Sequence, residues 1–443
     1  MKLWKWFVGL FFVLVIVDGA LRKWVLPSQS AALFVLKDVV LWSGFGFYAL
    51  RQSPLELPRP LHRTGVPLLL SGYTFIVLLQ AFNPRLPNLA VSALGLKAHL
   101  AFLPLVVLMP ALIIEATEKQ VIRTLWGYVL LLVLPLAALS VYQFYQPPSA
   151  WINQYVRDMG TIAMVAGHVR VIGTFSYIGS HTAYLTFNAF LSTGILLAGI
   201  RKRRRDLLAL GAILFGATFV VLPMTGSRSP MVIFLGALAV LLLIVESKFT
   251  ASLQFVAISL IVVAVLVQGT DLTEGWNALT ERATEVEDTE GRIEGFFYGP
   301  ILGLERGGLF GYGVGSNHQA ASRFAAGFGY DWLPQGYVES FNARIVTELG
   351  ALGWLLLTAL KGLLLFLAYQ TVRRSRRALE TIIGTTAFCM LLANLPSPVV
   401  YNVITGAFYW GSVGAMLGAW SIQRMRRRIS ASQQQHPHAE LPA

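Results

Sequence analysis

The chain has 443 residues, of which 55% are hydrophobic and only 13% are charged, and its formal net charge is +13. Its mean hydropathy of +0.62 is far above that of a soluble domain, so the composition excludes a soluble enzyme and predicts an integral membrane protein. The positive charge does not indicate nucleic-acid binding, because the basic residues cluster at the ends of apolar segments, where they face anionic lipid.

Apolar segments follow one another along most of the chain. About 17 to 25 such residues are needed to cross roughly 30 Å of hydrocarbon. We therefore predict an all-α membrane protein with about 12 transmembrane helices: Leu3–Val17, Ala31–Leu50, Gly65–Phe82, Leu94–Ile114, Val121–Tyr145, His181–Ile200, Leu207–Met224, Pro230–Val245, Ala251–Gly269, Ile345–Tyr369, Leu379–Leu395 and Val403–Ile422. The first is interpreted as a span and not as a signal peptide, because no small-residue cleavage site follows it.

Lysine and arginine are distributed unequally between the two sides of the predicted bundle. The short loops on the side of the N-terminus hold 21 of these residues, among them the run Arg201–Arg205, whereas those on the other side hold 7. Because cytoplasmic loops retain positive charge, this asymmetry predicts that both termini are cytoplasmic. The long polar segment between the ninth and tenth spans is then extracytoplasmic.

Five charged residues fall towards the outer ends of the first two predicted spans: Asp18, Arg22, Lys23, Lys37 and Asp38. Unpaired charge is costly at that depth, so these side chains are expected to pair with one another or to face a polar cavity. The first interpretation is a structural cluster of ion pairs. The alternative is a contact of Arg22 and Lys23 with the phosphates of a lipid substrate.

The long loop, residues 270–344, differs in character from the rest of the chain. The stretch from Asp271 to Glu348 holds twelve of the chain's 22 acidic residues against five arginines. Between Gly291 and His318, glycines and aromatic residues alternate with isolated polar groups, which predicts a folded lid whose backbone approaches a ligand closely. The glycines of Gly311-Tyr-Gly-Val-Gly315 lack a preceding strand and are interpreted as a turn, not as a nucleotide-binding loop.

The remaining features predict no metal site and no cofactor. The chain has one cysteine, Cys389, inside a predicted span, so no intrachain disulfide holds the outer loop. No metal-ligand or nucleotide-binding motif occurs. The polar tail, residues 430–443, lacks periodicity and is predicted to be disordered in the cytoplasm, after a membrane domain that covers residues 1–429.

Four short motifs resemble those of the O-antigen ligase and O-antigen polymerase superfamily of bacterial membrane proteins. They are Arg170-Val-Ile-Gly-Thr-Phe175 before the sixth span, Thr225-Gly-Ser-Arg228 after the seventh, Gly291-Arg292 in the long loop, and Glu348-Leu-Gly350 at the tenth span. The resemblance covers roughly residues 170–369. It implies a metal-independent glycosyltransferase that takes a glycan from undecaprenyl diphosphate on the outer face of the bacterial inner membrane and joins it to a glycan or lipid acceptor.

The resemblance also implies roles for single residues. Arg228 and Arg292 match the arginines that hold the diphosphate, with Arg170 as a further substrate-binding residue. This chain departs from the family pattern where a His-Asn pair is usual and Glu339-Ser340 stands instead, so Glu339 is the first candidate for the general base. His318 is the rival candidate for the base.

Arg323 and Asn342, at either side of the same region, are further substrate-binding candidates. The departure at Glu339 favours a polymerase or an enzyme of capsule or exopolysaccharide synthesis over a lipid A-core ligase. Two other classes stay open: an exporter or flippase of polysaccharide or lipid without transferase activity, and a signalling or scaffold protein. The sequence does not give the sugar, the linkage, the acceptor or the oligomeric state.

Overall fold

The computed structural model describes residues 2–52, 58–156, 162–165, 167–245, 298–326, 340–397 and 399–435, and these are mainly helical. The α-helices are α1 Leu3–Ala20, α2 Ser30–Arg51, α3 Val66–Gln80, α4 Leu89–Leu100, α5 Leu105–Glu115, α6 Glu118–Tyr128, α7 Leu134–Phe144, α8 Ile178–Lys202, α9 Arg205–Met224, α10 Ser229–Val245, α14 Ala321–Ala326, α15 Phe341–Arg373, α16 Ala378–Ala393 and α17 Val403–Gln435. One two-stranded antiparallel hairpin, β1 Met164–Val165 and β2 His168–Val169, lies between α7 and α8.

The helices agree with an all-α membrane protein. Seven helical stretches in the described residues are long and apolar enough to cross a membrane, and α3, α10 and α16 are shorter apolar helices. Every predicted span except Ala251–Gly269 overlaps a helix, and that segment lies outside the described residues. The total of twelve spans and the folded long loop therefore stay predictions. At the other end of the chain, α17 continues to Gln435, so residues 430–435 of the predicted tail are helical.

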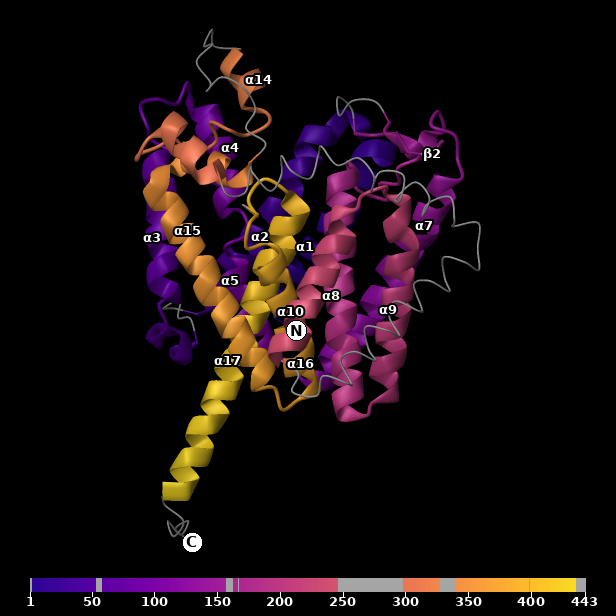
Figure 1. Cartoon of the computed structure of the whole chain (residues 1–443), viewed down its shortest axis with the longest axis vertical. Coiled ribbons are helices and arrows are strands. Elements are labelled where there is room, and N and C mark those ends of the chain that lie inside the picture. Colours follow the sequence, from indigo (N-terminus) through magenta and orange to yellow (C-terminus); the bar gives the residue numbers. More distant parts are fainter. Residues whose placement is uncertain are drawn as a thin grey trace.

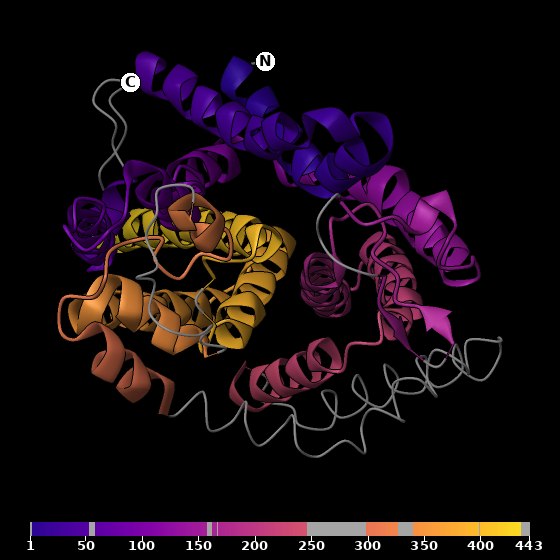
Figure 2. The same ribbon diagram turned by 90° about the horizontal axis from the view of Figure 1, so that it is seen from above.

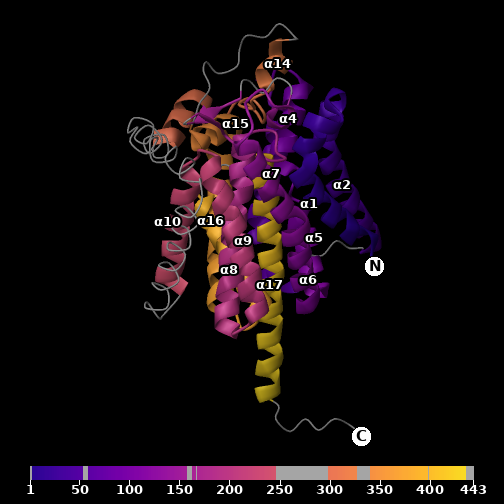
Figure 3. The same ribbon diagram turned by 90° about the vertical axis from the view of Figure 1, so that its right-hand side faces the viewer.

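The long helices form one bundle, with most connections at its two ends (Figure 1). Seen from above, α1 and α2 lie along one edge of the bundle and α10 along the opposite edge (Figure 2). Residues 298–326, the start of α15, α4 and β2 all lie at the same end, whereas the C-terminal part of α17 projects beyond the other end (Figures 1 and 3). We call the end that carries residues 298–326 the loop-bearing end.

Several helices contain irregular turns. A π-helical turn, η1 Leu21–Val25, extends α1 and carries Arg22 and Lys23, and a second one, η4 Val129–Val133, joins α6 to α7. Such turns interrupt the regular backbone pattern and are frequent at functional sites. In α15 the backbone leaves helical geometry at Gly350, where φ is 71° and ψ is 177°.

A second, smaller hydrophobic core holds the loop-bearing end together. Beside the main core between the long helices, it joins α3, α15 and the loop that precedes α14, through Tyr73, Val77, Ala81, Val314, Ile345, Leu349 and Leu357. The loop also meets α4 directly: a Cβ atom on Gly95 would lie 2.3 Å from the backbone nitrogen of Gly315, so neither position has room for a side chain. This packing fixes the polar groups that surround Glu348.

Candidate functional site

A fully buried carboxylate lies where the loop packs on α15. Oε2 of Glu348 is 2.9 Å from Nε2 of His99 in α4, and Nδ1 of His99 is 2.6 Å from the hydroxyl of Tyr73 in α3. The other carboxylate oxygen accepts a hydrogen bond of 2.9 Å from the backbone N–H of Asn317. The side chains of His99 and Glu348 have no exposed surface. A fully satisfied network of this kind rigidifies its surroundings, and here it connects three helices and the loop at Asn317.

A buried cation accompanies this carboxylate. Arg344, one turn before Glu348 in α15, is 1% exposed, and its guanidinium donates a hydrogen bond of 2.5 Å to the carbonyl of Asn317. The guanidinium also stacks on Tyr401, 3.7 Å from the ring centroid. Burial raises the pKa of the Tyr401 hydroxyl well above its ordinary value, so this group stays protonated. We call Tyr73, His99, Arg344, Glu348 and Tyr401 the Glu348 pocket.

His318 lies at the edge of the Glu348 pocket. Its Nδ1 accepts a hydrogen bond of 3.1 Å from the backbone N–H of Ala320, so the proton of the neutral ring is on Nε2. Burial lowers the pKa of His318, and the positive charges of Arg344 and Lys97 act in the same direction, against Glu348. In this arrangement His318 is neutral at pH 7 and presents a hydrogen-bond donor, which suits substrate binding better than the role of a base.

A second polar region gathers cations around one aromatic ring. Three cations lie near the centroid of the Phe34 ring: the Arg22 guanidinium at 5.1 Å, Lys37 Nζ at 4.3 Å and Lys97 Nζ at 3.4 Å. Asp18 pairs with Arg22 at 3.5 Å and with Lys37 at 3.6 Å.

Asp38 pairs with Lys97 at 3.0 Å. The ion pairs expected between the first two spans are therefore present, but they also include Lys97 of α4, which the sequence analysis did not single out. We call Asp18, Arg22, Lys37, Asp38 and Lys97 the cationic cluster.

Three of the singled-out sequence segments meet beside this cluster. Arg170 donates from Nε to the carbonyl of Thr225 and from a terminal nitrogen to the hydroxyl of Ser227, both at 2.8 Å. Lys23 donates to the carbonyl of Gly173 at 2.8 Å, and Arg22 donates to the hydroxyl of Ser176 at 3.3 Å. The end of α1, the segment before α8 and the turn before α10 are thus held together, and this turn carries Arg228.

The other predicted site residues are distributed as follows. Asn342 is partly buried in the first turn of α15, two residues before Arg344, and Arg323 is exposed in α14. Arg292 and Glu339 lie outside the described residues. The structure therefore places Arg22 and Lys23 against residues 173–176 of the segment that carries Arg170, and it places His318 beside Glu348. The assignment of Glu339 as the base stays a prediction.

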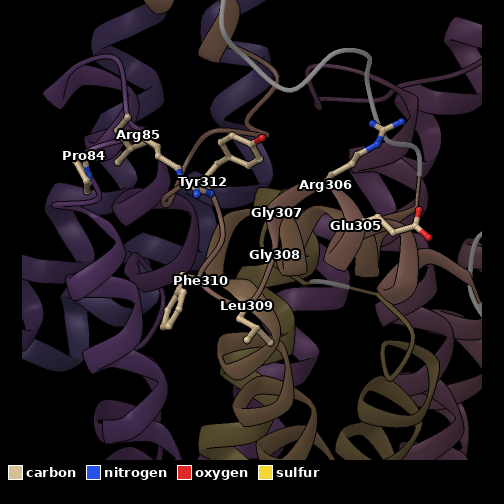
Figure 4. Close-up of a pocket in the computed structure, with 10 residues that line it drawn as sticks. Pro84, Arg85, Glu305, Arg306, Gly307, Gly308, Leu309, Phe310 and Tyr312 are labelled. Atoms are coloured by element: carbon tan, nitrogen blue, oxygen red, sulfur yellow. The ribbon is translucent and has the colours of Figure 1, made fainter.

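A cavity of about 760 Å³ opens at the loop-bearing end, between the turn after α3 and residues 305–312 (Figure 4). Arg85, Glu305, Arg306 and Tyr312 supply polar groups to its lining, and Phe310 supplies an aromatic ring. Arg85 lies over the ring of Tyr312, 5.3 Å from its centroid. Arginine guanidinium groups and aromatic rings in one cavity suit a ligand that has both hydroxyl groups and apolar faces.

The wall of this cavity rests on the Glu348 pocket. The backbone N–H groups of Tyr312 and Gly313 donate to the carbonyls of Thr347 and Glu348, at 2.7 and 3.1 Å. The turn predicted for Gly311–Gly315 is confirmed, with positive φ at all three of its glycines. The cavity and the buried carboxylate thus lie on opposite sides of one loop.

Tyr73, His99, Arg344 and Tyr401 are site residues that the sequence analysis missed. For His99 a signal was available, because Lys97 and His99 are ionisable residues inside an apolar span and such residues are functional candidates by default. The tyrosines carry no such signal. No group of three or more His, Cys, Asp or Glu side chains that could hold a metal ion occurs within the described ranges.

Comparison with known proteins identifies no relative: no family model, no curated protein and no solved structure matches this chain.

Proposed function

We propose that this chain is a membrane glycosyltransferase of the ligase or polymerase type. It takes a glycan from a polyisoprenyl-diphosphate carrier at the loop-bearing end and joins it to a glycan or lipid acceptor. The loop-bearing end then faces the extracytoplasmic side of a bacterial inner membrane, in keeping with the distribution of lysine and arginine. The products would belong to exopolysaccharide, capsule or O-antigen synthesis.

The observation that carries this proposal is the convergence at Arg170. Arg170 is fixed against the turn that ends in Arg228, and Arg22 and Lys23, from a distant part of the sequence, are fixed against residues 173–176 of the segment that carries Arg170. A departing diphosphate carries about two to three negative charges, and fixed guanidinium groups stabilise such charge in the transition state. Because these cations are already held by backbone and hydroxyl groups, little reorganisation is needed when the phosphates arrive.

The acceptor side of the reaction requires a base and a place for the sugars. In this proposal the cavity lined by Arg85, Glu305 and Tyr312 holds sugar residues, and Glu339 accepts the proton of the attacking hydroxyl. The Glu348 pocket positions the loop between the cavity and the cations. Glu348 itself is fully buried and bonded to His99, so it acts on the position of the loop and does not contact substrate.

Reconstitution of the full chain tests the proposal. The purified protein is placed in liposomes with lipid-diphosphate-linked oligosaccharide extracted from a strain that lacks this chain, and formation of longer or transferred glycan is measured together with release of the lipid diphosphate. Transfer that is lost in Arg170→Lys and Arg228→Lys supports the proposal. Movement of a fluorescent lipid-linked glycan across the bilayer without any transfer would overturn it in favour of an exporter or flippase.

A further inference from the structure

Arginines of two helices gather at the end of the bundle opposite to the loop-bearing end. Residues 369–435, which include the last turn of α15 and all of α16 and α17, contain eight arginines and one carboxylate, Glu380. One oxygen of Glu380 pairs with Arg426, and the other accepts hydrogen bonds from the backbone N–H groups of Arg376 and Arg377. This carboxylate is therefore already engaged, and the stretch holds no further acid for its other arginines.

Three of these arginines lie close together and are open to solvent. Arg424 and Arg427 are three positions apart on α17, so they are neighbours on one side of the helix, and both are exposed. Arg374 directly follows α15 and is partly buried. Burial lowers the pKa of the Arg374 guanidinium, and the positive charges of Arg427 and Arg424 act in the same direction. The three cations therefore repel one another, and an anion bound between them would offset that repulsion.

Contacts between α15 and α17 hold the guanidinium groups in place. Oε1 of Gln370 accepts a hydrogen bond of 3.0 Å from a terminal nitrogen of Arg374 and one of 3.4 Å from the indole N–H of Trp420. The Arg424 guanidinium lies over the Trp420 ring, 4.9 Å from its centroid. A guanidinium has five N–H donors, so Arg374 keeps donors for a ligand beside the bond to Gln370.

We propose that Arg374, Arg424 and Arg427 bind the phosphate of an anionic glycerophospholipid from the leaflet at this end of the bundle. Guanidinium groups hold phosphate oxygens through paired hydrogen bonds, and basic pockets between helix ends are a common form of headgroup site. A lipid is the occupant that the position favours, because the apolar span of α15 ends at Arg373 and Trp420 lies under Arg424, as aromatic residues do at the membrane–water interface. The lipid would fasten α17 to α15 where α17 leaves the bundle (Figure 3).

The test is native mass spectrometry of the purified full chain with equal amounts of phosphatidylglycerol and phosphatidylcholine that carry the same acyl chains. We expect the species with one bound lipid to contain an excess of phosphatidylglycerol. The double variant Arg374→Gln with Arg427→Gln should reduce this excess by about fivefold for each arginine removed, the contribution typical of one basic residue beside anionic lipid.

The matched control is Lys202→Gln with Arg205→Gln. It removes two charges from exposed positions at the turn between α8 and α9, at the same end of the bundle (Figure 1), and should leave the excess nearly unchanged. Equal losses in the two double variants would overturn the proposal, because the preference would then follow the net charge of this end and not a site.

Two further measurements complete the test. Arg424→Gln changes a single exposed residue and should by itself reduce the excess about fivefold; an unchanged excess would overturn the proposal even if the double variant failed to fold. An excess of inorganic pyrophosphate separates a lipid site from a site for soluble phosphates. Phosphatidylglycerol should stay bound, and its displacement would overturn the proposal in favour of a soluble ligand. Neither readout depends on transferase activity.

Discussion

The Glu348 pocket and the cationic cluster lie at the same end of the bundle but are built in opposite ways. In the Glu348 pocket, one carboxylate, Glu348, lies among two basic residues, His99 and Arg344, and the side chains of His99 and Glu348 have no exposed surface. The cationic cluster has more cations than carboxylates, and part of it lines a groove between α2, α3 and α4. The first arrangement holds backbone segments in place, whereas the second retains an excess of positive charge. Of the two regions, only the second has more permanently charged cations than carboxylates.

The largest effect should follow from removal of the carboxylate in the Glu348 pocket. Glu348→Ala leaves His99 and the N–H of Asn317 buried without an acceptor, and breaking a buried pair typically costs about 3–5 kcal/mol. We expect a large fall in the midpoint of thermal unfolding of the purified protein. Glu118→Ala is the control, since the pair of Glu118 with Arg204 is partly exposed and should contribute about 0–1 kcal/mol. Equal shifts in the two variants would contradict a structural role for the pocket.

Substitution of Arg170 should affect activity and leave the fold intact. Arg170→Lys keeps the charge but lacks the planar guanidinium whose Nε and terminal nitrogen reach Thr225 and Ser227. If the proposed function is correct, transfer should fall about 10²-fold, the lower end for loss of one transition-state contact. The transfer assay checks this at matched amounts of folded protein. Arg123→Lys, an exposed site on α6, serves as the control, and a comparable loss there would remove the specific role of Arg170.

Gly350 tests how the loop is held on α15. Its φ of 71° and ψ of 177° are accessible only to glycine, and an added Cβ would lie 2.0 Å from the carbonyl oxygen of Leu309. Gly350→Ala should destabilise the protein by about 1–3 kcal/mol. Gly362→Ala, in the same helix with free space around the added Cβ, should be neutral or stabilising. The comparison requires only thermal unfolding, and a neutral Gly350→Ala would contradict the kink.

The smallest effect concerns pH. Because burial lowers the pKa of His318 below 6.5, the folded state prefers the neutral ring. This preference is fully retained above the unfolded pKa of about 6.5 and is lost as the pH falls through that value towards the folded pKa. The unfolding midpoint should therefore decrease slightly more between pH 7.5 and pH 5 in the natural chain than in His318→Gln. Identical pH profiles would show that His318 is solvated.

Much of the architecture was predictable from local chemistry. Apolar runs of span length must become helices in a bilayer, since every backbone polar group there needs an internal partner. The charges near Arg22 were predicted to form ion pairs because unpaired charge is costly inside a bilayer. Asp18 pairs with Arg22 and with Lys37. Lys37 was expected to pair with a neighbouring charge or to face a polar cavity, and it is paired with Asp18 and is 2% exposed.

The sites depended on contacts that no local pattern encodes. The sequence by itself determined that the chain is helical, apolar and asymmetric in charge, because composition and periodicity act over single segments. Only the tertiary structure brought His99 to Glu348, 249 positions away, and Lys97 to Asp38. Which faces of α2, α3, α4 and α15 meet depends on packing around residues such as Gly95, Gly315 and Gly350, where the absence of a side chain permits the close approach of two backbones. The pairing of buried charges follows from that packing and could not be read from their spacing along the chain.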